Sequence, residues 1–181
     1  MLPLFVLKTS FQCADPPGTG ASLVEGKRVL ELGAGTGACG LAAAALGAAH
    51  VTLTDLPRLL PLLQQNVAVN PQLASRVVVA TLIWGDDEAV TALHPPVDVV
   101  LASDCLYQAA ALQPFLASLH ALSGQQTLTL LSLEHRQALP FPEAAFQAAG
   151  FDVQRLSAAE LDPDWSADDI HVYQIHLRQQ Q

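Results

Sequence analysis

The chain has 181 residues, of which 51% are hydrophobic and 14% are charged. This length and hydrophobic content suffice for one folded domain with its own core, and they exclude collagen-like, coiled-coil and fully disordered proteins. Eight Lys and Arg residues against 17 Asp and Glu residues give a net charge of −9. Because binding to a phosphate backbone requires clustered basic residues, we expect no nucleic-acid partner.

The cysteines and the apolar segments bear on the location of the protein. The three cysteines, Cys13, Cys39 and Cys105, form no CxxC pair, which fits a reducing compartment better than a secreted disulfide framework. The apolar stretch at residues 41–53 is interrupted by His50 and is too short to cross a bilayer, which requires about 20 apolar residues. We therefore predict a cytoplasmic protein with no membrane partner.

Strands and helices are expected to alternate along the chain. In chain order, the pattern predicts a strand at residues 28–32, a helix at 37–46, a strand at 50–54, a helix at 56–69, strands at 76–82 and 97–102, a helix at 109–122, a strand at 127–133, a helix at 143–149, and strands at 151–156 and 170–177. Apolar strands separated by helices are typical of an α/β fold with a parallel sheet covered on both faces. No convincing helix separates the final two strands, so we expect the last strand to run antiparallel.

The segment at residues 29–40, VLELGAGTGACG, is a strand that runs into glycines and then a helix. Gly33, Gly35 and Gly37 allow a tight turn and a close approach of the backbone to a ligand, while the helix N-terminus offers unpaired N–H groups. The pattern predicts a site for a nucleotide-like cofactor. It also contains GxGxxG, so an NAD(P)-dependent oxidoreductase is an alternative. The glycines could instead serve only the packing of strand against helix.

Two carboxylates accompany this glycine-rich segment. Asp55 ends the second predicted strand, where it could accept hydrogen bonds from a ribose or cap the helix that follows. Glu31 lies inside an apolar strand and must be paired or face the site. A cationic ligand would pair with it, which favours S-adenosylmethionine over a nicotinamide cofactor.

These residues, together with DLPRLLPLLQQNVAVN, LIWGDD, DVVLASDCLY and DIHVYQIHL, resemble the seven-β-strand methyltransferases, specifically the family 16 protein-lysine methyltransferases. The resemblance implies a Rossmann-like doubly wound sheet of order 3-2-1-4-5-7-6 with strand 7 antiparallel. It implies that Gly33, Ala34 and Gly35 wrap the methionine part of the cofactor and that Asp55 binds the ribose. By the same resemblance, Trp84 lies beside the adenine and Ser103 contributes backbone contacts; a core or lid aromatic is the alternative role for Trp84.

The stretch at residues 104–107, DCLY, matches the DxxY motif of this family. A lysine ammonium has a pKa near 10.4 and must lose a proton before it can accept a methyl group, so an apolar, aromatic channel would assist. Asp104 could orient the nitrogen, and Tyr107 could present its ring face or its hydroxyl. The alternative is that Asp104 caps a helix on which Tyr107 packs. Cys105 is interpreted as a small buried residue.

The resemblance also divides the chain. Residues 1–26 form a short N-terminal segment without the Trp-containing lid of the family, since Trp84 and Trp165 are the only tryptophans. Residues 27–178 form the S-adenosylmethionine-dependent methyltransferase domain. The short segment indicates a truncated gene model or a replaced lid, and it keeps open a catalytically weakened or inactive binding module.

The resulting hypothesis is a methyltransferase that modifies a lysine side chain of another protein. In that family, chaperones, an AAA-type ATPase and elongation factors are substrates, and DIHVYQIHL resembles the chaperone-directed branch. A small-molecule methyltransferase is a further alternative. We expect a monomer, and the histidine spacing predicts no metal site.

Overall fold

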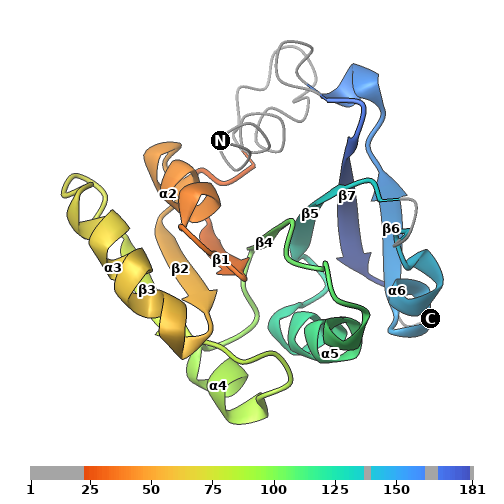
Figure 1. The fold of residues 1–181 in the computed structure, drawn as a ribbon, viewed down its shortest axis with the longest axis horizontal. Helices are drawn as coiled ribbons and strands as arrows, with labels where there is room; N and C mark the ends of the chain where they lie inside the picture. Colours follow the sequence, from red (N-terminus) through yellow and green to blue (C-terminus); the bar gives the residue numbers. More distant parts are fainter. Residues whose placement is uncertain (1–22, 137–139, 162–166, 180–181) are drawn as a thin grey trace.

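The computed structural model describes residues 23–136, 140–161 and 167–179. A seven-stranded sheet runs through the molecule in the order β3-β2-β1-β4-β5-β7-β6 (Figure 1). The strands are β1 Arg28–Leu32, β2 His50–Asp55, β3 Val77–Thr81, β4 Val99–Ser103, β5 Leu128–Glu134, β6 Phe151–Arg155 and β7 Ile170–Leu177. The α-helices are α2 Ala38–Ala45, α3 Leu60–Ala68, α4 Asp87–Ala92, α5 Leu112–Leu122 and α6 Glu143–Ala148.

The structure confirms the strand order that the family resemblance implied and the antiparallel last strand that the sequence pattern predicted. Strand β1 pairs parallel with β2 and β4, and the parallel pairing continues outward to β3 and β5. Strand β7 lies between β5 and β6 and is antiparallel to both. Antiparallel neighbours need no helical crossover, and the described residues between β6 and β7 hold only the 3-10 turn η3 Ala158–Glu160.

The sheet is covered on both faces because side chains alternate along each strand. Leu30 and Leu32 belong to a buried cluster that includes residues of α4, α5 and α6, whereas Val29 belongs to a second cluster with residues of α2 and α3. In Figure 1, α4, α5 and α6 lie on the lower right side of the sheet, and α2 and α3 lie on its upper left side. This arrangement is the doubly wound fold expected from the sequence.

Some elements differ from the sequence prediction. Helix α4 was not predicted: its six residues make fewer than two turns, which is too short for a helical periodicity to show. Its start is stabilised by Asp86, whose side chain accepts a 3.0 Å hydrogen bond from the Ala89 N–H. The helix predicted from residue 56 begins instead as the 3-10 turn η1 Pro57–Leu59.

Parts of the predictions lie outside the described residues. They include Cys13, Trp165 and most of the segment 1–26, so the division of the chain at residue 26 stays a prediction. In the described part of the chain, no helix has the length and apolar character needed to span a membrane.

Candidate active site

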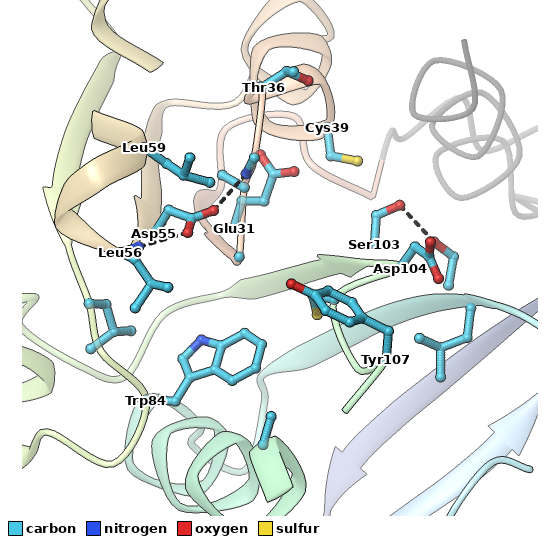
Figure 2. Close-up of a pocket in the computed structure, with 18 of the residues that line it drawn as sticks. Glu31, Thr36, Cys39, Asp55, Leu56, Leu59, Trp84, Ser103, Asp104 and Tyr107 are labelled. Atoms are coloured by element: carbon cyan, nitrogen blue, oxygen red, sulfur yellow. Dashed lines mark hydrogen bonds between the residues drawn. The ribbon is translucent and has the colours of Figure 1, made fainter. Parts of the chain in front are cut away.

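A cavity of about 600 Å³ opens where the carboxyl ends of β1, β2, β4 and β5 meet. Ligands of open α/β sheets bind at this edge, and the volume is typical of small-molecule sites. The structure brings every predicted site residue to this cavity: Glu31, Gly33, Ala34, Gly35, Asp55, Trp84, Ser103, Asp104 and Tyr107. Figure 2 shows Glu31, Asp55 and Trp84 toward one end and Ser103, Asp104 and Tyr107 toward the other.

The glycine-rich loop after β1 requires glycine for its backbone. Gly33, Gly35 and Gly37 have φ angles of 65°, 56° and 77°, a region that other residues rarely adopt. A Cβ atom at Gly33 would lie 3.1 Å from the Trp84 ring and 3.0 Å from the Cβ of Cys105. A Cβ atom at Gly35 would meet nothing within 4 Å. The loop therefore packs closely at Gly33 and leaves open space beside Gly35.

Glu31 is both hydrogen-bonded and directed toward the cavity. The side chain comes from β1 and is only 2% exposed. Its Oε2 accepts a 2.8 Å hydrogen bond from the N–H of Gly40, near the start of α2. Burial raises the pKa of Glu31 to about 7, and the Gly40 hydrogen bond partly opposes that shift. A cation bound beside this carboxyl group would favour its charged form.

Asp55 links the end of β2 to the glycine-rich loop. One carboxylate oxygen, Oδ2, accepts a 2.7 Å hydrogen bond from the Gly35 N–H, and the other, Oδ1, accepts a 2.7 Å hydrogen bond from the Leu56 N–H. Each carboxylate oxygen has two acceptor positions, so Asp55 keeps capacity for hydroxyl donors in the cavity. No side chain caps the turn that follows, η1 Pro57–Leu59, whose N-cap position is Leu56. The helix-capping role considered from the sequence is therefore not observed, and Asp55 faces the cavity.

Trp84, which follows β3, forms one wall of the cavity. Its ring meets that of Phe115 edge to face, with centroids 5.1 Å apart and planes inclined by 79°. Edge-to-face contact is a favourable geometry for aromatic rings. Trp84 is therefore held by the core while it lines the cavity.

Asp104 and Tyr107 lie just beyond β4, at the other end of the cavity. Asp104 has a φ of 45°, and its N–H donates a 2.8 Å hydrogen bond to the carbonyl of Ser132 on β5. Its carboxylate lies 3.2 Å from the guanidinium of Arg136. The Tyr107 side chain is well exposed, at 57%. Ser103 accepts a 3.1 Å hydrogen bond from the Ser132 hydroxyl.

The sequence analysis missed two charged residues at this end, Glu134 and Arg136. Glu134 is the last residue of β5 and lines the cavity. The rule that located Asp55, a carboxylate where a parallel strand ends, would also have located Glu134. Arg136 carries no such signal because it becomes part of the site only through its contacts with Asp104 and Glu134.

Cys39 and Cys105 are buried free thiols. Burial is the main cause that raises the pKa of each thiol above its ordinary value. A raised pKa leaves little thiolate at neutral pH, which agrees with the interpretation of Cys105 as a packing residue.

Comparison with known proteins assigns the chain to a family. A family model described as "lysine methyltransferase" matches residues 2–145. The chain belongs to the lysine methyltransferase family. This membership favours methyl transfer over the NAD(P)-dependent alternative.

Two curated relatives and one solved structure illustrate the similarity. EEF1A lysine methyltransferase 3 of Xenopus tropicalis is 40% identical over 113 residues, which cover 62% of this chain and 49% of the relative. Protein N-lysine methyltransferase METTL21A of Danio rerio is 39% identical over 154 residues, which cover 83% of this chain and 66% of the relative. The matched part of this lysine methyltransferase chain thus spans about half to two thirds of the length of these relatives.

The solved structure is glycopeptide N-methyltransferase MtfA complexed with sinefungin. It superposes with a TM-score of 0.67 at 17% identity, covering 83% of this chain and 86% of that chain. At this identity the likeness shows a shared methyltransferase fold.

Proposed function

We propose that this chain transfers a methyl group from S-adenosylmethionine to a lysine side chain of another protein. The chain belongs to the lysine methyltransferase family, and the observation that carries the proposal is that two sets of residues share one cavity. The glycine-rich loop, Asp55 and Trp84 lie at one end of this cavity, and the DxxY pair lies at the other. The first set suits a nucleoside with a cationic tail. The second set suits an amine acceptor.

The residues at the first end fit S-adenosylmethionine. Glu31 and the loop at residues 33–35 would hold the amino-acid part, where a buried carboxyl group can pair with an ammonium. Asp55 would accept hydrogen bonds from the ribose, and Trp84 would cover the adenine. When bound, the cofactor supplies a methyl group activated by a sulfonium. The solved structure of MtfA, which has the same fold, is a complex with sinefungin, which supports this cofactor class.

The residues at the other end would position the acceptor. Asp104 can attract the incoming lysine ammonium, and the exposed Tyr107 ring can pack along the lysine carbons. Once its proton has passed to solvent, the amine nitrogen forms a bond to the methyl carbon as the carbon–sulfur bond breaks and leaves its electron pair on sulfur. The task of the protein is therefore alignment and partial exclusion of water.

One relative, EEF1A lysine methyltransferase 3, is named for EEF1A as the protein that it methylates. We therefore propose an elongation factor as the first acceptor to test, with chaperones and an AAA-type ATPase as the other candidates. Such acceptors agree with a cytoplasmic location, with S-adenosylmethionine available in the same compartment.

The test uses the purified chain, methyl-labelled S-adenosylmethionine and two acceptors, purified EEF1A and a heated cell extract. Methyllysine in the hydrolysed proteins is the expected product. We expect Asp104→Asn to lower the transfer rate at least about tenfold with unchanged affinity for S-adenosylhomocysteine. We expect Asp55→Asn to weaken that affinity about tenfold or more, because hydrogen bonds to a charged group contribute about 1.5–3 kcal/mol.

Asp86→Asn is the matched control, since the Asp86 carboxylate, like that of Asp55, accepts a hydrogen bond from a backbone N–H but does not line the cavity. Binding of S-adenosylhomocysteine without methyllysine would indicate an inactive binding module. Label found only in small molecules would indicate a small-molecule methyltransferase, and binding of NADH alone would support the oxidoreductase. Each of these three results would overturn the proposal.

A further inference from the structure

Two carboxylates separate the large cavity from a smaller one. The smaller cavity, of about 150 Å³, is lined mainly by apolar residues between the start of α5 and the residues before α6. Asp104 and Glu134 line both cavities, whereas Arg136 lines only the smaller one. Arg136 therefore contacts the two carboxylates from the side of the smaller cavity. The carboxylates also line the larger cavity, where methyl transfer is proposed.

The guanidinium of Arg136 bridges the two carboxylates. Its Nη2 lies 3.2 Å from both Oδ1 and Oδ2 of Asp104. Its Nε and Nη2 donate to Oε2 of Glu134 at 3.0 Å and 2.8 Å. The side chains are 35%, 44% and 41% exposed for Arg136, Asp104 and Glu134. One positive charge thus meets two negative charges, and the group keeps a net charge of −1.

The backbone of Asp104 is fixed independently of this ion pair. Its φ of 45° is unusual for a residue with a side chain, and Asp is among the few residues that tolerate it. The hydrogen bond from its N–H to Ser132 ties the turn to β5, whose Ser132 is the register partner of Ser103 on β4. Backbone strain of this kind persists where the surroundings impose it, and it clusters at functional sites. With the backbone held, Arg136 determines where the carboxylate of Asp104 points.

We propose that Arg136 is a positioning residue that holds Asp104 and Glu134 as a paired acceptor site, and that Glu134 is a second carboxylate for the lysine ammonium. This inference rests on the proposed lysine methyl transfer. A net charge of −1 is matched to one ammonium ion. Without Arg136 the same two carboxylates would carry a charge of −2, would repel each other, and would hold the lysine in its charged form, because nearby anions raise an amine pKa.

The planar guanidinium of Arg136 also fixes the orientation of the two carboxylates. A guanidinium presents planar, paired donors to two carboxylates, whereas a lysine ammonium is a point charge on a flexible stem. Substitution by lysine would keep the net charge and lose the fixed orientation. The charge and the geometry of Arg136 can therefore be tested separately.

The test measures kcat and KM for purified EEF1A, or for the acceptor found in the cell extract, as a function of pH. In Arg136→Gln we expect the pH at which kcat is half-maximal to rise by about half to one unit, because the acceptor amine faces an additional net negative charge. At pH 7.5 this shift and the lost orientation together lower kcat about tenfold. We expect Arg136→Lys to restore the pH midpoint but only part of kcat.

In Glu134→Gln we expect KM for the acceptor to rise several-fold and the pH midpoint of kcat to fall. Arg178→Gln is the matched control, since it removes a 3.0 Å pair between Arg178, just after β7, and Asp152 of β6, outside both cavities. In every variant the affinity for S-adenosylhomocysteine should stay within about twofold, because these residues lie at the acceptor end. Thermal melting confirms that each variant is folded.

The outcomes separate this inference from the proposed function. If the unsubstituted chain forms no methyllysine, the proposed function fails, and this inference fails with it. If the unsubstituted chain methylates lysine and both Arg136 variants keep its pH midpoint, kcat and KM, only the positioning role is overturned. Equal losses in the two Arg136 variants with no pH shift would also overturn the proposed role of net charge.

Discussion

At the scale of single residues, Glu31 determines how the cofactor end of the cavity responds to pH. Burial raises its pKa to about 7, whereas an unfolded glutamate has a pKa of about 4.3. Between these two values the folded protein without ligand keeps a proton that the unfolded chain has lost. The free energy of unfolding therefore falls as pH rises through this window. Above about pH 7 the contribution of Glu31 to that free energy no longer changes with pH.

Ligand binding should reverse this trend. The ammonium of S-adenosylhomocysteine favours the Glu31 carboxylate, so binding below pH 7 releases a proton. We expect the affinity to rise about tenfold from pH 6 to pH 7.5 and then to level off. In Glu31→Gln the affinity should be lower at pH 7.5 and nearly independent of pH. Calorimetric titration at each pH, in two buffers of different ionisation enthalpy, measures both the affinity and the proton release; equal pH slopes in the two proteins would contradict the assignment.

At the scale of elements, the predictable parts are those in which local pattern and tertiary structure agree. The strand at Arg28–Leu32 and the one at Ile170–Leu177 have the bounds that the sequence predicted, because each is an apolar or alternating run with clear ends. The fourth strand begins two residues later than predicted, at Val99. There the Asp98 carboxylate accepts the N–H of Arg28 at 2.8 Å, a contact between distant segments that no local pattern contains.

In the site, too, residues placed by local sequence could be predicted, whereas contacts between distant segments could not. Asp55 could be predicted because it ends its own strand, which puts it at the carboxyl edge of the sheet. Asp104 could be predicted because it belongs to the DxxY motif of the family that the sequence resembles. The bridge from Arg136 to Asp104 spans 32 residues of chain. It depends on the pairing of β4 with β5 and on side-chain conformations, so it required the structure.

The contact of α2 with the sheet is the element on which the cofactor end depends. A Cβ atom at Gly40 would collide with the Leu53 side chain, and it would lie 3.0 Å from both Val51 and the Oε2 of Glu31. Glycine at this position lets α2 approach β1 and β2 closely. The close approach in turn allows the Gly40 N–H to reach Glu31.

We therefore expect Gly40→Ala to lower stability by about 1–3 kcal/mol through overpacking. It should also weaken S-adenosylhomocysteine binding, since the helix must shift away from Glu31. The control is Ala45→Gly at the exposed C-terminal end of the same helix, which should cost at most about 1 kcal/mol of stability through helix propensity. Denaturant unfolding and calorimetric titration of both variants provide the comparison. Equal affinities in the two variants would show that the packing of α2 does not control the site.

At the scale of the whole molecule, a chain of aromatic rings joins the cavity to the closing strands. Trp84 contacts Phe115 of α5 at a centroid distance of 5.1 Å, and Phe115 contacts Phe146 of α6 at 6.2 Å. Phe146 then reaches Phe151 at the start of β6 at 6.3 Å. Phe115, Phe146 and Phe151 are fully buried. The antiparallel end of the sheet thus shares one core with the wall of the cofactor cavity.

This arrangement predicts that two similar core substitutions have different effects on binding. Phe115→Leu and Phe146→Leu should each lower stability by about 1–2 kcal/mol, because both replace a buried ring by a smaller side chain. Of the Phe115 and Phe146 rings, only that of Phe115 contacts Trp84. An edge-to-face contact contributes about 0.5–1.5 kcal/mol, so its loss in Phe115→Leu should weaken S-adenosylhomocysteine binding about threefold to tenfold. Phe146→Leu should leave the affinity unchanged. Titration of both variants well below their melting temperatures tests this, and an equal loss of affinity in the two would mean that the core acts on the cavity as a whole rather than through Trp84.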